Sequence, residues 1–123
     1  MNKFLWASPH TPTKQQRLEM HNNVVLLQDK KPDLFNRLSN IHIGTDLDEL
    51  SVELLQYCLI RAYTLVQPAG SPAFMAVLGK HRIEFNKVPI IFSFSKRMSI
   101  DEEQPDGSIK KVSIFKHEGF INI

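Results

Sequence analysis

Polar side chains that could bind or transform a ligand follow two of the apolar runs in this sequence. After the run at 3–7 come Ser8, His10, Thr11 and Thr13, and after the run at 63–66 come Gln67, Gly70 and Ser71. Hydroxyl and amide groups orient the polar atoms of a ligand, and an unperturbed histidine changes its charge near neutral pH. The two segments therefore predict a site for a polar or anionic small molecule.

The member of this set that could do acid–base chemistry is His10. It could donate to a phosphate or act as a general acid or base, and an exposed loop residue without function is an equally good interpretation. Ser93 and Ser95 end a later apolar run, and Lys96 and Arg97 follow them. The residues that we expect to bind the ligand are Ser8, Thr11, Thr13, Lys14, Gln67, Gly70, Ser71, Ser93 and Ser95.

The apolar runs alternate with helical patterns and are followed by a hairpin. We expect strands at 3–7, 24–28, 63–66 and 88–95, helices at 14–21, 33–39, 47–62 and 73–85, and a hairpin with its turn at 105–107 and its second strand at 109–115. The run at 120–123 either extends that strand or forms another. This order predicts an α/β fold, a three-layer Rossmann-like sandwich with a mainly parallel sheet and a C-terminal antiparallel hairpin, in a single domain over 1–123.

The starts of two helices would point at the same edge of such a sheet. Thr11 with Pro12 has the order of an N-cap and first helical residue, and Thr13 with Gln16 is an alternative capping box. Ser71 precedes a proline in the same way. If the first and third strands are neighbours, both helix starts face one crevice at the carboxyl edge, where backbone N–H groups favour a phosphate. Ordinary helix capping is the competing interpretation.

Composition excludes several classes of function. Fifteen Lys and Arg against 13 Asp and Glu leave a net charge of +2, without the basic patch that duplex DNA requires. The single cysteine excludes an internal disulfide and a cysteine-based metal cluster, and the histidines lack metal-ligand spacing, so we expect no metal. Neither G-x-G-x-x-G nor a Walker A motif occurs, so we expect no cofactor. We expect a cytoplasmic protein without a membrane segment.

Other conspicuous residues have structural interpretations. Trp6 and Cys58 fall on apolar faces and are predicted to be core residues. Thr45 or Asp46 is predicted to cap the helix at 47–62, and Asp48 and Glu49 fit its first turn, where carboxylates are stabilising. The acidic run at 101–103 is predicted to be a solvated loop, and the histidines other than His10 are predicted to lie on the surface.

The two polar segments also carry a resemblance. Residues 8–15 (SPHTPTKQ) and 65–72 (LVQPAGSP), with the downstream strand at 88–91, resemble a family of small proteins associated with type III CRISPR systems. Members of this family are Rossmann-like and related in outline to CARF domains. Some are ring nucleases or sponges for cyclic oligoadenylates. Residues 26–50 have no clear match.

The resemblance implies a nucleotide second messenger as the ligand and a homodimer as the assembly. It leaves open whether the ligand is only bound or also cleaved. Cleavage would be a metal-independent attack of a ribose 2′-hydroxyl on the adjacent phosphate, with His10 as base or acid and Ser71 holding the phosphate. The alternative from a different class is a non-catalytic, dimeric interaction or regulatory protein.

Overall fold

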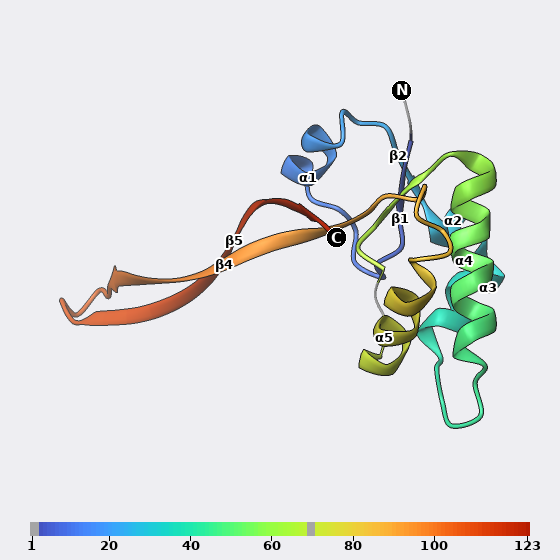
Figure 1. The fold of residues 1–123 in the computed structure, drawn as a ribbon. Coiled ribbons are helices and arrows are strands. Elements are labelled where there is room, and N and C mark those ends of the chain that lie inside the picture. Colours follow the sequence, from blue (N-terminus) through green and yellow to red (C-terminus); the bar gives the residue numbers. More distant parts are fainter. Residues whose placement is uncertain (1–2, 69–70) are drawn as a thin grey trace.

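The fold is built on a mixed, mostly parallel sheet (Figure 1). The computed structural model describes residues 3–68 and 71–123, and all of their side chains except those at 115 and 116. The strands are β1 (Phe4–Trp6), β2 (Val24–Leu26), β3 (Thr64–Val66), β4 (Ile90–Glu103) and β5 (Ile109–Asn122). Their order is β2-β1-β3-β4-β5, in which only the β4–β5 pair is antiparallel.

Three of the helices begin directly after a residue whose side chain caps them. They are α1 (Lys14–Glu19), α2 (Leu27–Lys30), α3 (Pro32–Ser39), α4 (Leu47–Arg61) and α5 (Pro72–His81). Thr13 and Gln16 form the capping box of α1, so this alternative start is confirmed over Thr11. Ser71 caps α5 through its side-chain oxygen as predicted, and of the two caps expected for α4 the structure has Asp46. No helix in the described parts of the chain is long and apolar enough to cross a membrane.

Two apolar clusters cover opposite faces of the sheet, because alternate strand residues point to opposite sides. The larger cluster places Leu5, Leu65 and Ile90 against buried residues of α2, α3, α4 and α5. The smaller cluster places Trp6 and Val66 against Met20 at the end of α1, with Phe120 of β5 partly buried beside them. Trp6 and Cys58 are buried as predicted.

Several strand boundaries differ from the sequence-based expectation, and two of the differences change the conformation of a segment. The second strand ends at Leu26, and Leu27 begins the short helix α2. Trp6, the last residue of the neighbouring strand β1, pairs with Leu26. Residues after Leu26 therefore have no strand beside them with which to form backbone hydrogen bonds. The acidic run at 101–103 is not a loop: it lies in β4, where Asp101 pairs with Lys111 and Glu102 with Lys110. Opposite charges across a strand pair stabilise it.

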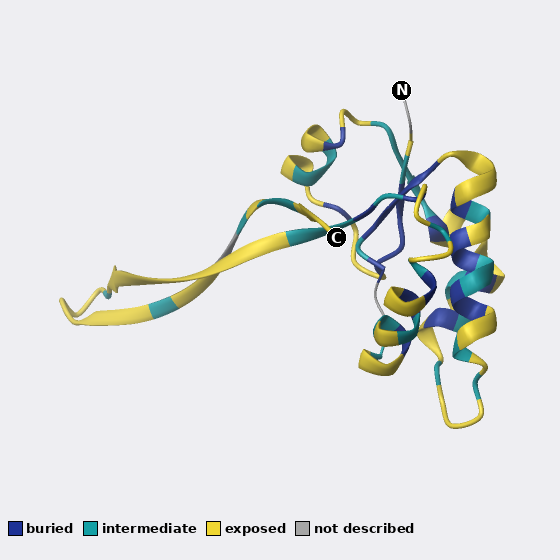
Figure 2. Ribbon diagram, in the orientation of Figure 1, coloured by how far each residue is buried: buried dark blue, intermediate teal, exposed yellow. Residues whose placement is uncertain are grey.

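The hairpin is much longer than predicted. Both of its strands have 14 residues, and the run at 120–123 continues β5 as far as Asn122. Only Ile90 and Ile91 of β4 pair with β3, so most of the hairpin extends away from the sheet as a two-stranded ribbon. Figure 2 shows that this ribbon is largely exposed, whereas the buried residues concentrate between the short strands and the helices.

Candidate functional site

The strand order brings the two polar segments to one edge of the sheet. β1 pairs with β3, and β3 pairs with the start of β4, so the chain leaves neighbouring parallel strands at the carboxyl edge. Gln67 is the first residue after β3. Its N–H donates to the Ile91 carbonyl at 2.9 Å, and its Oε1 accepts from the Ser93 N–H at 2.7 Å. Gln67 has a φ of 53°, an uncommon conformation for a residue other than glycine and one often found at functional sites.

The helix α1 contributes a second amide to Ser93. Gln16 Oε1 accepts from the Thr13 N–H at 2.8 Å, which completes the capping box. The other end of the same amide, Nε2, donates to Ser93 Oγ at 3.1 Å. The start of α1 and the site are therefore linked through a single side chain, because Gln16 uses its oxygen for the helix and its nitrogen for Ser93.

A histidine that the sequence did not single out lies next to Ser93. His117 Nδ1 is 2.6 Å from Ser93 Oγ, and His117 Nε2 is 2.6 Å from Glu19 Oε2. The His117 side chain is only 8% exposed, against 33% for Glu19. A carboxylate can only accept, so Nε2 carries the hydrogen and, in the neutral ring, Nδ1 accepts from the Ser93 hydroxyl. We call Ser93, His117 and Glu19 the Ser–His–Glu chain.

This arrangement can polarise a hydroxyl group. A serine that donates to a histidine oriented by a carboxylate can transfer its proton to the ring, and the same ring can exchange a proton with a ligand. Developing negative charge on an attacked group would need hydrogen-bond donors. The N–H of Ser93 already donates to Gln67, whereas the Gln16 amide nitrogen, 3.1 Å from Ser93 Oγ, carries a second hydrogen that it can donate.

The structure distributes the predicted ligand-binding residues over the same edge, but only some of them contact one another. Gln67 and Ser93 are bonded, and Thr13 is linked to Ser93 through Gln16. Ser71 caps α5 by accepting from the Phe74 N–H at 3.2 Å. Exposed side chains are those of His10, Thr11, Thr13, Lys14 and Ser95. Gly70 lies outside the described residues.

The loop after β1 is folded onto its own backbone. Ser8 is 9% exposed, and its Oγ accepts from the His10 N–H at 3.2 Å. Trp6 Nε1 donates to the His10 carbonyl. The cavity beneath this loop has a volume of about 20 Å³, enough for a single water molecule. The space beneath the loop is therefore too small for a nucleotide.

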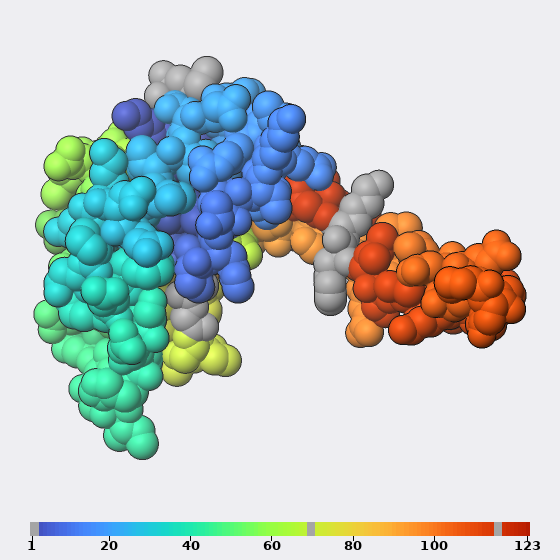
Figure 3. Space-filling view, turned by 180° about the vertical axis from the view of Figure 1, so that it is seen from behind, coloured from blue at the N-terminus to red at the C-terminus, as the bar shows by residue number. Residues whose placement is uncertain are grey.

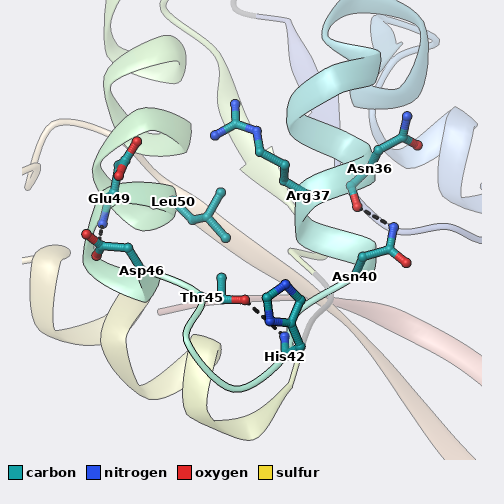
Figure 4. A pocket seen from close by; sticks show the side chains of 8 residues that line it. All are labelled: Asn36, Arg37, Asn40, His42, Thr45, Asp46, Glu49 and Leu50. Carbon is teal, nitrogen blue, oxygen red and sulfur yellow. Dashed lines mark hydrogen bonds between the residues drawn. The ribbon is translucent and has the colours of Figure 1, made fainter.

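A larger cavity of about 460 Å³ lies between α3 and α4 (Figure 4). Its walls carry the carboxylates of Asp46 and Glu49. Arg37 lines it too, but its guanidinium makes two bonds of 2.8 Å to Glu53, which raise its pKa. The Asp46 carboxylate accepts from the Glu49 N–H at 3.0 Å, as expected of a cap. These charges make the cavity unsuited to an anion.

Sequence reasoning missed Gln16, Glu19 and His117 as members of the site. His117 was predicted to be a surface residue, and its ring is instead held between Ser93 and Glu19. The signal that could have found it is the hairpin register, which pairs Ser95 with His117 across the ribbon. That register depends on a bulge between Phe94 and Ser95, which local patterns do not reveal.

Comparison with known proteins supplies a family. The model described as "Uncharacterized protein MJ1673 family" matches residues 2–121. The chain belongs to this family. No curated protein and no solved structure matches it significantly. The description of the MJ1673 family names neither an activity nor a ligand, so a function for this member has to be argued from its site.

Proposed function

We propose that the protein binds a nucleotide second messenger, such as a cyclic oligoadenylate, at the carboxyl edge of its sheet. The observation that carries the proposal is the convergence of Gln67, Gln16 and His117 on Ser93, which lies in β4 two residues beyond the last residue that pairs with β3. In open α/β sheets, ligands bind outside the carboxyl ends of the strands. The proposal includes the finer fold description, a Rossmann-like sandwich of three layers.

The side chains around Ser93 suit a phosphate-containing ligand. Hydroxyl and amide groups donate to phosphate oxygens, and Lys14 at the start of α1 is exposed. Arg97 follows Ser95 by two positions, so it lies on the same face of β4. Figure 3 shows the surface hollowed between the hairpin and the segment that precedes α1. A small polyanion needs only such local donors, so the low net charge does not oppose this ligand.

Cleavage of the ligand would need one proton acceptor and one proton donor. The ribose 2′-oxygen would form a bond to the adjacent phosphorus while the bond to the 5′-oxygen breaks; a base takes the 2′ proton, and an acid protonates the 5′-oxygen. Two histidines are candidates. His117 is held by Ser93 and Glu19, whereas the hydrogen bonds of His10 use its backbone and leave its exposed ring free to approach a ligand.

The binding experiment is a thermal-shift screen and a calorimetric titration with cyclic tetra- and hexa-adenylate, AMP and inorganic phosphate. We expect a cyclic oligoadenylate to raise the unfolding temperature, and Ser93→Ala to reduce affinity by about tenfold, as expected for loss of one hydrogen bond to a charged group. Ser99→Ala is the matched control, because Ser99 lies further along β4 on the same face. Absence of any shift with every nucleotide would refute the proposal.

Chromatography of each bound nucleotide then separates binding from cleavage. If the ligand is cleaved, the histidine whose replacement by Gln lowers the rate far more than the affinity is the proton carrier. If it survives unchanged, the protein is a binding protein of the sponge type. The association with type III CRISPR systems is implied by the resemblance alone. Binding of a cyclic oligoadenylate in the same ligand panel would support it.

A second candidate function is that of a non-catalytic interaction protein. The specific observation that favours it is the projecting ribbon, on which Met98, Ile100 and Ile114 are each 37–41% exposed. Material absorbing at 260 nm that co-purifies with the protein would favour the nucleotide site instead.

A further inference from the structure

The hairpin contains a bulge that changes the direction of His117. In a regular antiparallel pair, alternate residues share a face, so His117 and Phe120 would point to opposite sides of the sheet. Two successive residues of β4 pair with Gly119 and His117, so Glu118 is an extra residue in β5. The bulge places His117 on the same face as Phe120, and the two rings meet edge to face at 5.2 Å. Bulges are common next to active sites, where they re-aim a side chain.

The hydrogen bonds of Ser93 leave its hydroxyl oxygen able to attack a bound molecule. The hydroxyl lies 2.6 Å from His117 Nδ1, to which it donates, and it accepts from Gln16 Nε2 at 3.1 Å. A hydroxyl oxygen has two acceptor lone pairs, so one of them remains free. Ser93 is half-buried, whereas the His117 side chain beside it is only 8% exposed and bonds Glu19 through its other nitrogen. A serine becomes a strong nucleophile when a base held by a third group takes its proton.

Two amide groups flank Ser93 and can donate to an attacked carbonyl oxygen. Gln16 Nε2 has a second hydrogen besides the one that it donates to Ser93. The Gln67 amide reaches Ser93 from the end of β3: its Oε1 accepts from the Ser93 N–H at 2.7 Å, and its Nε2 donates to no acceptor in the described part of the chain. Donors that are already in place stabilise the negative charge that develops on the oxygen.

The surface next to these polar groups is apolar. Phe120 pairs directly with Ser93 across the hairpin, so the two side chains point the same way. Phe120 packs with Trp6 and Ile91 in the smaller core cluster and is only partly buried there. Apolar surface beside an attacking oxygen suits the uncharged acyl group of an ester.

We propose that Ser93 is the nucleophile in the hydrolysis of a carboxylic ester, with His117 as its base. Ser93 Oγ forms a bond to the carbonyl carbon while its proton passes to His117 Nδ1. The bond from that carbon to the alkoxy oxygen then breaks, and His117 returns the proton to the departing alcohol. A water molecule attacks the acyl-serine in the same way, which releases the acid and restores Ser93. This activity goes beyond nucleotide binding and does not depend on it.

The first test uses an alkyl fluorophosphonate, which labels an activated serine whatever its natural substrate. Attack by Ser93 Oγ forms an oxygen–phosphorus bond and releases fluoride, so we expect the intact mass to rise by one phosphonyl group, mapped to Ser93 in peptides. Ser93→Ala should abolish this labelling, and His117→Gln should slow it by about 100-fold or more, as expected for loss of a general base. Ser99→Ala, further along β4 on the same face, is the matched control and should label at the wild-type rate.

The results distinguish a nucleophile from a structural hydrogen bond. An unlabelled wild-type protein, or a label on another residue, would overturn the proposal without the use of any variant. Equal labelling rates for the wild type and His117→Gln would also overturn it, provided that thermal unfolding shows the variant to be folded. A serine that only fastens α1 to the hairpin gains no reactivity from the histidine.

A second measurement tests the class of substrate. With p-nitrophenyl acetate and p-nitrophenyl butyrate, we expect a burst of about one nitrophenolate per chain as the acyl-serine forms, followed by slower turnover. Ser93→Ala should lack the burst, and Ser99→Ala should retain it. A serine that the fluorophosphonate labels but that hydrolyses neither ester would refute the carboxylic ester as the substrate.

Discussion

The side chains of Glu19 and His117 meet although 98 positions separate them, with Glu19 Oε2 lying 2.6 Å from His117 Nε2. The helix α1, which ends at Glu19, has only six residues and none of them is buried. Short helices depend on tertiary contacts for their stability. The bonds of Gln16 to Ser93 and of Glu19 to His117 therefore hold α1 against the base of the hairpin, and in doing so they assemble the candidate site.

Removal of the Glu19 carboxylate tests this attachment. We expect Glu19→Gln to destabilise the protein by about 1–2 kcal/mol, because a nearly buried histidine loses a charged acceptor. For a chain of this size that lowers the unfolding temperature by roughly 4–8 °C. Glu118→Gln, at an exposed position next to His117, serves as the control and should leave the temperature unchanged. Equal effects of the two variants would contradict a specific role for Glu19.

The contact between His81 and Asp48 should make stability depend on pH. It ties the end of α5 to the first turn of α4 with a 2.6 Å bond. The hydrogen bond to Asp48, aided by Glu84, raises the pKa of His81, and the bonds to His81 and Lys80 lower the pKa of Asp48. The protonated form of His81 and the ionised form of Asp48 are therefore both favoured in the folded state.

The signs of these two shifts define the pH window. The raised pKa of His81 stabilises the fold fully below the unfolded-state value of about 6.5, and this contribution is lost as pH rises through the folded-state pKa. The lowered pKa of Asp48 contributes above about pH 4 and is lost as pH falls. We expect urea titrations to show a decline in wild-type stability as pH rises from about 6.5 through the raised pKa of His81, and His81→Gln to lack this decline. Identical pH profiles for the two proteins would contradict the assignment.

Cys58 should be inert in the native protein. It is fully buried in α4, and burial raises the pKa of its thiol to about 12. Thiolates are the reactive form. We expect no alkylation by iodoacetamide at pH 8 in buffer and complete alkylation in concentrated urea, measured by intact mass. Rapid modification of the folded protein would show that Cys58 becomes accessible to the reagent, contrary to its burial in α4.

The end of α4 offers a stabilising substitution. Ala62 terminates the helix in the left-handed conformation, with a φ of 56°, and it is exposed. Glycine adopts this conformation without a penalty from a Cβ atom. We expect Ala62→Gly to stabilise the fold by about 0.5–1 kcal/mol in chemical denaturation. Ala76→Gly, at an exposed position within α5, is the control and should destabilise by about the same amount.

Local signals in the sequence predicted the elements and their caps. Thr13 with Gln16, Asp46 and Ser71 mark the starts of α1, α4 and α5, because a side-chain oxygen bonds a backbone N–H only three residues away. The burial of Cys58 likewise follows from helical spacing within α4. Such interactions involve neighbours in the chain, so they can be recognised without knowledge of the rest of the fold.

Some of the residues that meet at Ser93 could be recognised in the sequence. Gln67 directly follows an apolar strand, and Ser93 comes directly after the apolar residues at the start of β4, so both were recognisable. His117 and Glu19 were not, because each becomes significant only when a register and a helix position are known. His10 remains a prediction, since its ring is free and exposed whereas the ring of His117 is held on both sides.

Local patterns in the chain were thus enough to predict the succession of strands and helices, the buried face of each, and the polar residues near the strand ends. Three features became known only from the folded protein: β1 lies beside β3, 101–103 continues a strand, and His117 reaches Glu19. The difference lies in the range of the interactions. Caps and amphipathic faces arise between residues a turn apart, whereas strand order, register and the Ser–His–Glu chain arise from contacts between distant segments that form only when the chain is folded.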